Sequence, residues 1–284
     1  MNILQSPREI QQTADALRRE GKRIGLVPTM GYLHEGHASL IRIARAKSDI
    51  VITTIFVNPM QFAPGEDFSR YPRDLERDKK IAKSAGTDIL FTPTSDDIYP
   101  RDFNSQVYVD NLSTLLEGKF RPMHFRGVTT IVAKLFHLTK PSLAVFGQKD
   151  IQQAVIIRKM VKDLDFGIEI IIGPTVREPD GLAMSSRNVY LTESERKQST
   201  VLHRSLRQAE TDIHAGERNA GTITGKMIEM ISAQPSARID YVSVSDPVNL
   251  QDVATLRSSS EVIVSLAVRF GSTRLIDNII VPVP

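Results

Sequence analysis

The sequence predicts an α/β protein, in which a parallel sheet with helices on both faces is followed by a smaller α+β unit. Short apolar runs alternate with segments of helical periodicity as far as about residue 172. After Gly173-Pro174 the pattern changes to a run of helices and then a run of strands. We therefore expect two domains, residues 1–175 and residues 176–284, with ligands at the carboxyl ends of the parallel strands.

In the first domain, each element is predicted from apolar periodicity and from residues that start or stop helices. Ser6 followed by Pro7 is typical of an N-cap and a first helical position, and Gly21 is typical of a helix end. A loop rich in proline, glycine and phenylalanine covers residues 58–71. In order, we expect helix Pro7–Glu20, strand Ile24–Val27, helix Glu35–Lys47, strand Ile50–Val57, helix Pro72–Ala85, strand Asp88–Phe91, helix Phe125–Thr139, strand Leu143–Phe146, helix Asp150–Asp163 and strand Ile168–Ile172.

The second domain is predicted to contain two helices and three strands. A long polar-apolar periodicity predicts the first helix, and alternating or continuous apolar runs near the end of the chain predict the strands. The expected elements are helices Thr192–Ala215 and Ala220–Ser232 and strands Ile239–Val244, Glu261–Ala267 and Thr273–Asn278.

Composition and charge narrow the functional classes. Hydrophobic residues make up 41% and charged residues 24% of the 284 residues, which is typical of a globular protein. The chain has no cysteine, no apolar run near the roughly 20 residues that span a bilayer, and no signal-peptide pattern, so we expect a cytoplasmic protein without a membrane partner. The net charge of +3 comes from basic residues interspersed with acids, which suits small anionic substrates and not nucleic acid.

The most informative stretch is PTMGYLHEGH at residues 28–37, which joins a predicted buried strand to a predicted helix. His34 and His37 stand three residues apart, so they face the same side of the first helical turn. Unpaired backbone N–H groups and the positive end of the helix dipole favour an anion there. Because Gly31 and Gly36 allow a sharp bend and a close approach, we interpret the stretch as a phosphate-binding turn.

Other interpretations of these residues agree less well with the sequence. Structural zinc needs four ligands, but the chain lacks cysteine and its four other histidines show no ligand-like spacing, so no protein-held metal is expected. The HExxH spacing of a metalloprotease is absent. GTITGK at residues 221–226 is one residue too short for a P-loop, and Met227 replaces the serine or threonine that holds magnesium. A GxGxxG dinucleotide motif is also absent.

Further polar residues follow other predicted strands and the presumed hinge. Lys149 offers a point charge, Arg187 offers a planar fork that can hold a phosphate through two bonds, and Ser185 and Ser186 offer hydroxyl groups. Each of these residues alone is typical of a surface pair, a loop or a helix cap. Together they match a nucleoside triphosphate site, which needs cations, hydroxyls and backbone donors from several loops.

Six segments in order give the chain a resemblance to the pantoate–β-alanine ligases, the pantothenate synthetase family, over essentially its whole length. They are PTMGYLHEGH at 28–37, FVNPMQF at 56–62, HFRGVTTIVAKLF at 124–136, FGQKDIQQ at 146–153, MSSRN at 184–188 and RLIDN at 274–278. The first segment is similar to the HIGH signature of the wider nucleotidyltransferase superfamily, and MSSR takes the place of its KMSKS loop. The resemblance implies a Rossmann-like nucleotidyltransferase domain, a C-terminal α+β lid domain and a homodimer.

The resemblance also implies a reaction in two steps. The carboxylate of pantoate attacks the α-phosphorus of ATP to give pantoyl adenylate and pyrophosphate, and the amine of β-alanine then displaces AMP. Magnesium is expected to accompany the phosphates. An adenylyltransferase of the same superfamily, which leaves the nucleotide on its product, remains the alternative, and an RNA-binding relative of the synthetases is a more distant one.

Carried over by motif, the resemblance implies a role for individual residues. The catalytic residues are His37, His34, Lys149 and Arg187, with His37 as the proton-donor candidate, and Gln61 and Gln153 bind pantoate. Gln148 stands where the family usually has glutamate, which removes one negative charge beside Lys149, and Ile151 stands where an aromatic residue is common. The implied ATP-binding residues are Met30, Gly31, Tyr32, Leu33, His34, Glu35, Gly36, His37, Gly147, Gln148, Lys149, Asp150, Val176, Met184, Ser185, Ser186 and Arg187.

Overall fold

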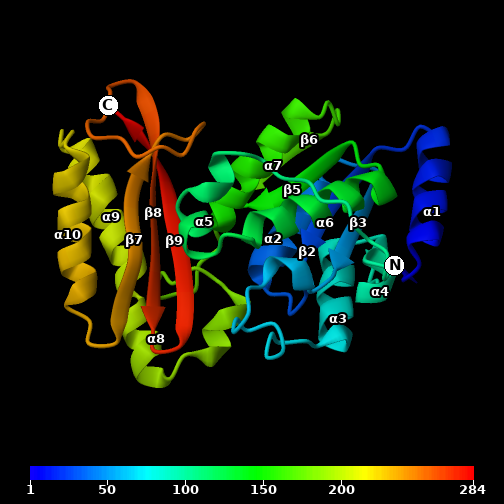
Figure 1. The fold of residues 1–284 in the computed structure, drawn as a ribbon, viewed down its shortest axis with the longest axis horizontal. Coiled ribbons are helices and arrows are strands. Elements are labelled where there is room, and N and C mark those ends of the chain that lie inside the picture. Colours follow the sequence, from blue (N-terminus) through cyan, green and yellow to red (C-terminus); the bar gives the residue numbers. More distant parts are fainter.

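The structure, a computed structural model, describes residues 1–284 and contains two separate sheets (Figure 1). Six parallel strands form the first sheet in the order β1-β4-β3-β2-β5-β6, which confirms the predicted α/β class. Three antiparallel strands form the second sheet in the order β7-β8-β9. The strands are β1 Asn2–Leu4, β2 Ile24–Thr29, β3 Ile50–Ile55, β4 Ile89–Phe91, β5 Leu143–Gly147, β6 Glu169–Gly173, β7 Ala237–Ser245, β8 Ser260–Phe270 and β9 Thr273–Val283.

Helices cover both faces of the parallel sheet and one face of the antiparallel sheet (Figure 1). Most begin and end within a few residues of the positions that the sequence predicts. The α-helices are α1 Pro7–Arg19, α2 Glu35–Arg45, α3 Leu75–Ala85, α4 Ser95–Ile98, α5 Glu117–Phe120, α6 His124–Thr139, α7 Ile151–Asp163, α8 Glu193–Ser199, α9 Val201–His214 and α10 Ala220–Ser232; the 3-10 turns are η1 Pro59–Gln61, η2 Leu112–Thr114, η3 Gln148–Asp150 and η4 Ser186–Tyr190.

Two predicted helices were wrong in detail, and one short strand was not predicted. The helix expected from Pro72 begins at Leu75, because the Asp74 side chain accepts the Arg77 backbone N–H at 3.0 Å and caps the helix there. The helix expected over residues 192–215 is two helices. At their junction, the Ser199 and Thr200 hydroxyls donate to backbone carbonyls of the preceding turn, an arrangement that bends helices. The short edge strand β1 was not predicted, since three residues carry no legible periodicity.

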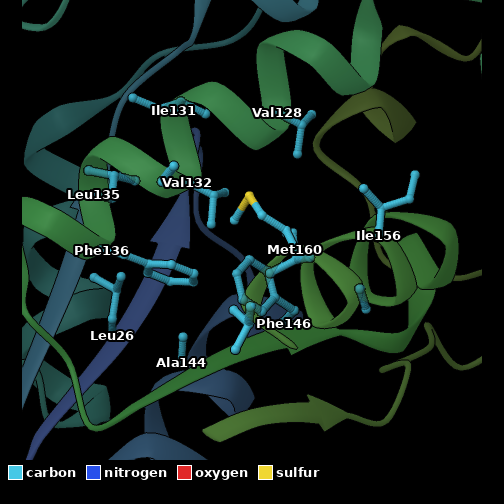
Figure 2. Packing of buried hydrophobic residues seen from close by; sticks show 14 of the residues in the cluster. Leu26, Val128, Ile131, Val132, Leu135, Phe136, Ala144, Phe146, Ile156 and Met160 are labelled. Atoms are coloured by element: carbon cyan, nitrogen blue, oxygen red, sulfur yellow. The ribbon is translucent and has the colours of Figure 1, made fainter. Parts of the chain in front are cut away.

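The hydrophobic core has one cluster on each face of the parallel sheet and a third in the C-terminal unit. Helices α1, α6 and α7 cover one face, where Leu26 of β2 and Phe146 of β5 meet Phe136 and Met160 of the helices (Figure 2). Helices α2 and α3 cover the other face. The antiparallel sheet buries its outer face against α9 and α10. Burial on both faces explains why the parallel strands read as continuous apolar runs.

The parallel sheet opens between β2 and β5. β2 pairs with β5 only at Gly25 and Leu26, whereas it pairs with β3 along its whole length. The backbone of Thr29 bonds toward β3, so Pro28 faces β5, where the pairing has already ended. A proline has no N–H to offer a neighbouring strand, and none is needed here. β2 leads away toward β3 and β5 toward β6, so this gap is the switch point of the sheet, where ligands are expected.

Candidate active site

A cavity of about 570 Å³ lies at the carboxyl ends of β2, β3 and β5 and reaches the antiparallel sheet. Its place is the one that the sheet topology predicts. The two glutamines and most of the predicted ATP-site residues share its wall, although they come from segments as far apart as residues 30 and 187. The predicted residues that line the cavity are Met30, His34, Gly36, His37, Gln61, Gly147, Lys149, Asp150, Gln153, Val176, Met184, Ser185, Ser186 and Arg187.

Five predicted nucleotide contacts do not line the cavity. Leu33 is fully buried in the core beneath α2 and α3, and the Tyr32 ring packs under the Arg77 guanidinium, 4.8 Å from ring centroid to guanidinium carbon. Glu35 is exposed and pairs with Arg42. Together with Gly31 and Gln148, these residues belong to the cavity-bearing segments without reaching the space themselves. The resemblance therefore assigned a nucleotide contact to every residue of a motif, although only some of these residues face the cavity.

The two histidines cap the helix that they begin. His34 is the N-cap of α2, and its Nδ1 accepts the Gly36 backbone N–H at 3.2 Å. In return, His37 Nδ1 accepts the His34 backbone N–H at 3.3 Å, which completes a capping box made of imidazoles. The ring centroids are 4.1 Å apart. A Cβ added at Gly36 would lie 2.9 Å from the His34 ring, so a larger residue would push the ring away from its capping position.

This geometry fixes the protonation of both rings. Burial, reinforced by the positive charge of Lys149, lowers the pKa of His34 to about 4. Burial and then the neighbouring His34 lower the pKa of His37 well below its usual value. Both rings are therefore neutral near pH 7, and since each Nδ1 accepts a hydrogen bond, each Nε2 carries the proton. The turn presents two neutral N–H donors on a cavity wall.

A buried carboxylate on α3 holds the turn that precedes the histidines. Asp78, 1% exposed, accepts the backbone N–H groups of Tyr32 at 2.7 Å and Leu33 at 2.6 Å. Gly31 and Tyr32 both have a positive φ, of 85° and 50°, so the chain reverses sharply here. Charge-assisted bonds to two successive N–H groups stabilise a conformation that is unfavourable for a tyrosine.

The MSSR segment reaches the cavity with its arginine already paired. Arg187 donates to Asp67 through two parallel bonds, Nε to Oδ2 at 2.8 Å and Nη2 to Oδ1 at 2.9 Å. Although burial opposes it, the bond to Asp67 raises the pKa of Arg187 above its usual value. Ser185 caps the following turn, and the Ser186 hydroxyl donates to the Tyr32 carbonyl at 3.3 Å. The segment is thus tied directly to the histidine turn.

Gln61 is the last residue of the η1 turn, which follows β3, and it lines the cavity. Its Oε1 accepts from Asn58 Nδ2 at 3.2 Å, and its Nε2 lies 2.8 Å from the Met30 sulfur. The Asn58 amide also donates to the Gly127 carbonyl at 3.0 Å. Gly127 lets α6 approach this turn, because any Cβ there would overlap the Met60 carbonyl oxygen. Beside Gln61 the wall becomes apolar, formed by residues such as Phe56, Val128 and Val132.

Comparisons with known proteins bear directly on this arrangement. The family model described as pantoate-beta-alanine ligase matches residues 2–280. The chain belongs to the pantoate–β-alanine ligase family. A pantothenate synthetase of Moorella thermoacetica is 51% identical over 283 residues, 100% of this chain and 99% of that protein. One of Desulfatibacillum aliphaticivorans is 51% identical over 278 residues, 98% of each chain.

Solved structures of the ligase family share the whole fold. A pantothenate synthetase from Thermus thermophilus has 44% sequence identity and a TM-score of 0.92, with 98% of this chain and 99% of that chain covered. A pantoate-beta-alanine ligase from Francisella tularensis, complexed with beta-gamma ATP and beta-alanine, has 36% identity and a TM-score of 0.81, with 98% and 97% covered. The architecture here is therefore that of the ligase family, a Rossmann-like sheet followed by a three-stranded antiparallel unit.

Several cavity residues of this ligase-family chain were not assigned a role from the sequence. Arg121 donates to both oxygens of Glu66, at 2.6 and 2.7 Å, and to the Gln61 carbonyl at 3.2 Å. His124 Nδ1 lies 2.9 Å from that carbonyl and must donate to it. Burial lowers the pKa of His124 to about 4, with Arg121 as the next cause, so the ring is neutral. The HFRG segment at residues 124–127 was the sequence feature that could have indicated His124, but the sequence did not show which part of the fold this histidine would contact.

The cavity wall contains no cluster of side chains that could coordinate a metal ion by themselves. The structure contains no group of three or more histidine, cysteine, aspartate or glutamate residues that could hold a metal ion. Single carboxylates are present, and Asp150, whose side chain is 50% exposed, stands 3.9 Å from Lys149. No helix of the structure combines the length and apolarity needed to cross a membrane.

Proposed function

We propose that this chain joins pantoate to β-alanine with ATP, by way of a pantoyl adenylate. Family membership supports the ligase activity. The observation that carries the proposal is the single cavity, in which a neutral histidine pair, Lys149 and Arg187 face a wall that is part amide and part apolar. The polar side suits a triphosphate, and the remaining wall suits a small branched hydroxy acid.

In the first step, a carboxylate oxygen of pantoate bonds to the α-phosphorus, and the bond from that phosphorus to the bridging oxygen breaks. Pyrophosphate leaves with the bonding electrons. The Nε2–H groups of His34 and His37 stabilise charge that grows on the phosphate oxygens, and Lys149 neutralises the departing pyrophosphate. The site has no protein nucleophile in this scheme, so catalysis rests on position and charge.

Arg187 requires an exchange of partners. In the structure its fork is occupied by Asp67, whereas the proposed role is to hold a phosphate. A phosphate group presents the same two-oxygen geometry as a carboxylate, so the guanidinium can exchange one for the other. The turn that carries Asp67 is then expected to move when ATP binds.

In the second step, the neutral amine of β-alanine bonds to the acyl carbon, and the bond from that carbon to the phosphate oxygen breaks. AMP leaves with the bonding electrons, and the nitrogen gives up one proton, which a phosphate oxygen of the leaving AMP can accept. A closed cavity protects the mixed anhydride from water during this step. Gln61 and Gln153 are the proposed partners of pantoate, whose hydroxyls and carboxylate suit amide groups, while its methyl groups suit Val128 and Val132.

Magnesium, a homodimer and a cytoplasmic location complete the proposal. Mg²⁺ prefers one or two carboxylates together with substrate phosphates, and the exposed Asp150 beside Lys149 fits that requirement. The ion would neutralise charge on the phosphates of ATP. The dimer rests on the family resemblance, and the location rests on the cysteine-free composition.

The test is to identify the products. With ATP, pantoate and β-alanine, the purified protein should release AMP and pyrophosphate in equal amounts, and mass spectrometry without β-alanine should detect a bound pantoyl adenylate. Release of ADP would contradict the proposal. A nucleotide that stays on the final product, with no dependence on the amine, would instead support the adenylyltransferase alternative. Gln61→Ala should raise the KM for pantoate more than that for ATP.

A further inference from the structure

The RLIDN segment, residues 274–278, has no role in the reaction as proposed so far. It occupies the first half of β9, the edge strand nearest the parallel sheet unit (Figure 1). Side chains alternate along the strand. Leu275 belongs to the core of the C-terminal unit, whereas Arg274 and Asn278 reach across to the first unit.

Asn278 makes two hydrogen bonds to the backbone of the Lys149 turn. Its Nδ2 donates to the Gln148 carbonyl at 2.9 Å and to the Lys149 carbonyl at 2.9 Å. The side chain is 2% exposed, so water does not compete for these bonds. Both neighbours are acceptors, which fixes the orientation of the amide with nitrogen toward the turn.

The Lys149 turn has little local support of its own. It is a three-residue 3-10 turn, η3, without a side-chain cap at Gly147, and α7 begins after it without a cap from Asp150. Lys149 makes one contact with an acid, Asp150, at 3.9 Å, which is longer than a hydrogen bond. Consequently the two bonds from Asn278 are the side-chain contacts that fix this backbone.

Two residues that precede Asn278 in the segment, Arg274 and Asp277, hold β9 through ion pairs. Arg274 pairs with Glu117 on α5, with Nη2 and Oε1 2.9 Å apart, and with Asp240 of β7 at 2.6 Å. Asp277, 2% exposed, accepts from Arg177 at 2.6 and 3.1 Å. These pairs join β9 to α5, to β7 and to the chain that follows β6. The Arg274–Glu117 pair therefore ties β9 to the first unit, and the other two pairs fix the strand within the C-terminal unit.

We propose that Asn278 is a positioning residue for the adenylation step, which fixes the Lys149 backbone so that its ammonium group faces the phosphates of ATP. The inference rests on the proposed function of Lys149 and extends it to the C-terminal unit. It makes RLIDN a docking strand that completes the phosphate site. Since pyrophosphate has left before the amide forms, the second step does not depend on this placement.

The experiment combines Asn278→Ala with Lys149→Ala and measures each half-reaction. Asn278→Ala should slow pantoate-dependent pyrophosphate release roughly 10- to 100-fold, the scale of a misplacement of about 1 Å. Amide formation from supplied pantoyl adenylate and β-alanine should stay within about threefold. The double variant should be no slower in adenylation than Lys149→Ala alone, because Asn278 acts through that side chain.

Two further variants keep the test decisive. Ser243→Ala removes another buried hydrogen bond from the same antiparallel sheet, to Asp252 at 2.6 Å, and should leave adenylation within about twofold. Asn278→Thr suits a strand and keeps one donor, so it should recover part of the lost rate even if Asn278→Ala folds poorly.

Titration with ATP separates this inference from the proposed function. Asn278→Ala should weaken ATP binding in the protein that has Lys149, and it should have no further effect in the Lys149→Ala variant. Because this measurement uses ATP alone, its result does not depend on which acid the protein activates. Multiplicative losses in the double variant, or equal losses in both half-reactions, would overturn the positioning role. Absence of pantoate-dependent pyrophosphate release from the unmodified protein would instead contradict the proposed function.

Discussion

Two turns at the carboxyl ends of the parallel strands present the proposed phosphate-binding groups, and different contacts support each turn. The histidine turn after β2 caps its own helix and is held by Asp78 of the same unit, and Ser186 of the C-terminal unit adds one bond to the Tyr32 carbonyl at 3.3 Å. The Lys149 turn after β5 has no side-chain cap and is gripped by Asn278 of the antiparallel sheet.

This difference shows how the C-terminal unit can influence the site without contributing a reacting group. The histidine donors are held mainly by contacts within the parallel-sheet unit, in α2 and to Asp78 of α3. By contrast, the position of the lysine depends on the docking of β9, so its geometry is sensitive to movement between the two units. Changes at the interface should therefore affect charge neutralisation at the lysine and leave the histidine donors intact.

The largest effect is expected from His37→Ala, which removes one of the two neutral donors. Adenylation should slow by about 10²- to 10³-fold, the range found when one charge-stabilising donor is lost. Pyrophosphate release measures it. His37→Gln separates the two roles of the residue, because glutamine at this position can still accept the His34 N–H and preserve the capping box. It should slow adenylation comparably while losing less stability. Unchanged turnover in both variants would remove His37 from the reaction.

A smaller effect, confined to the lysine turn, is expected from Glu117→Gln. This change weakens the buried pair with Arg274, which keeps Asp240 as a second partner, so unfolding free energy should fall by about 2 kcal/mol. The KM for ATP should rise as β9 loosens. Urea unfolding and steady-state kinetics provide the measurements, and Lys197→Ala, at an exposed ion pair, is the control that should change neither. A large loss of stability with an unaltered KM for ATP would show that β9 docking does not reach the lysine.

The complementary change on the histidine side is Asp78→Asn. An amide can accept one of the two backbone N–H groups but turns its own donor toward the other, so we expect a loss of about 1.5 kcal/mol of unfolding free energy. Adenylation should slow while the affinity for pyrophosphate, the proposed ligand of Lys149, stays nearly constant. A fall in pyrophosphate affinity as large as the fall in rate would mean that the two turns are not supported independently.

The smallest effect concerns acidity. Because the pKa of His34 is about 4 in the folded protein and near 6.5 when unfolded, the unfolded chain binds more protons between those values. Stability is therefore fully present above about pH 6.5 and falls as the pH drops toward 4. From pH 7 to 5 the loss should be about 1 kcal/mol for His34, whose partial exposure weakens the effect. Asparagine can replace His34 as an N-cap, so thermal melting of His34→Asn should depend less on pH over this range. An identical pH dependence in the two proteins would contradict the assignment.

Much of the fold could be predicted because its signals are local. Buried parallel strands read as apolar runs, and Ser6 and the histidine turn mark helix starts through contacts within three residues. The convergence of distant loops followed from the general rule for parallel sheets. One prediction that failed also depended on local contacts. The apolar periodicity of residues 192–215 predicts one continuous helix, but hydroxyl side chains at residues 199–200 bend the chain there.

What the sequence by itself determined is the α/β class, the position of the site at the carboxyl ends of the strands, and the histidine pair with its glycines, since each depends on neighbours along the chain. Only the tertiary structure decided which partners hold these groups. Asp78 lies 46 residues from Tyr32, Asp67 lies 120 residues from Arg187, and Asn278 lies 129 residues from Lys149. A side chain such as asparagine or aspartate can bond to any backbone group within reach, so its partner is set by how the two sheets pack.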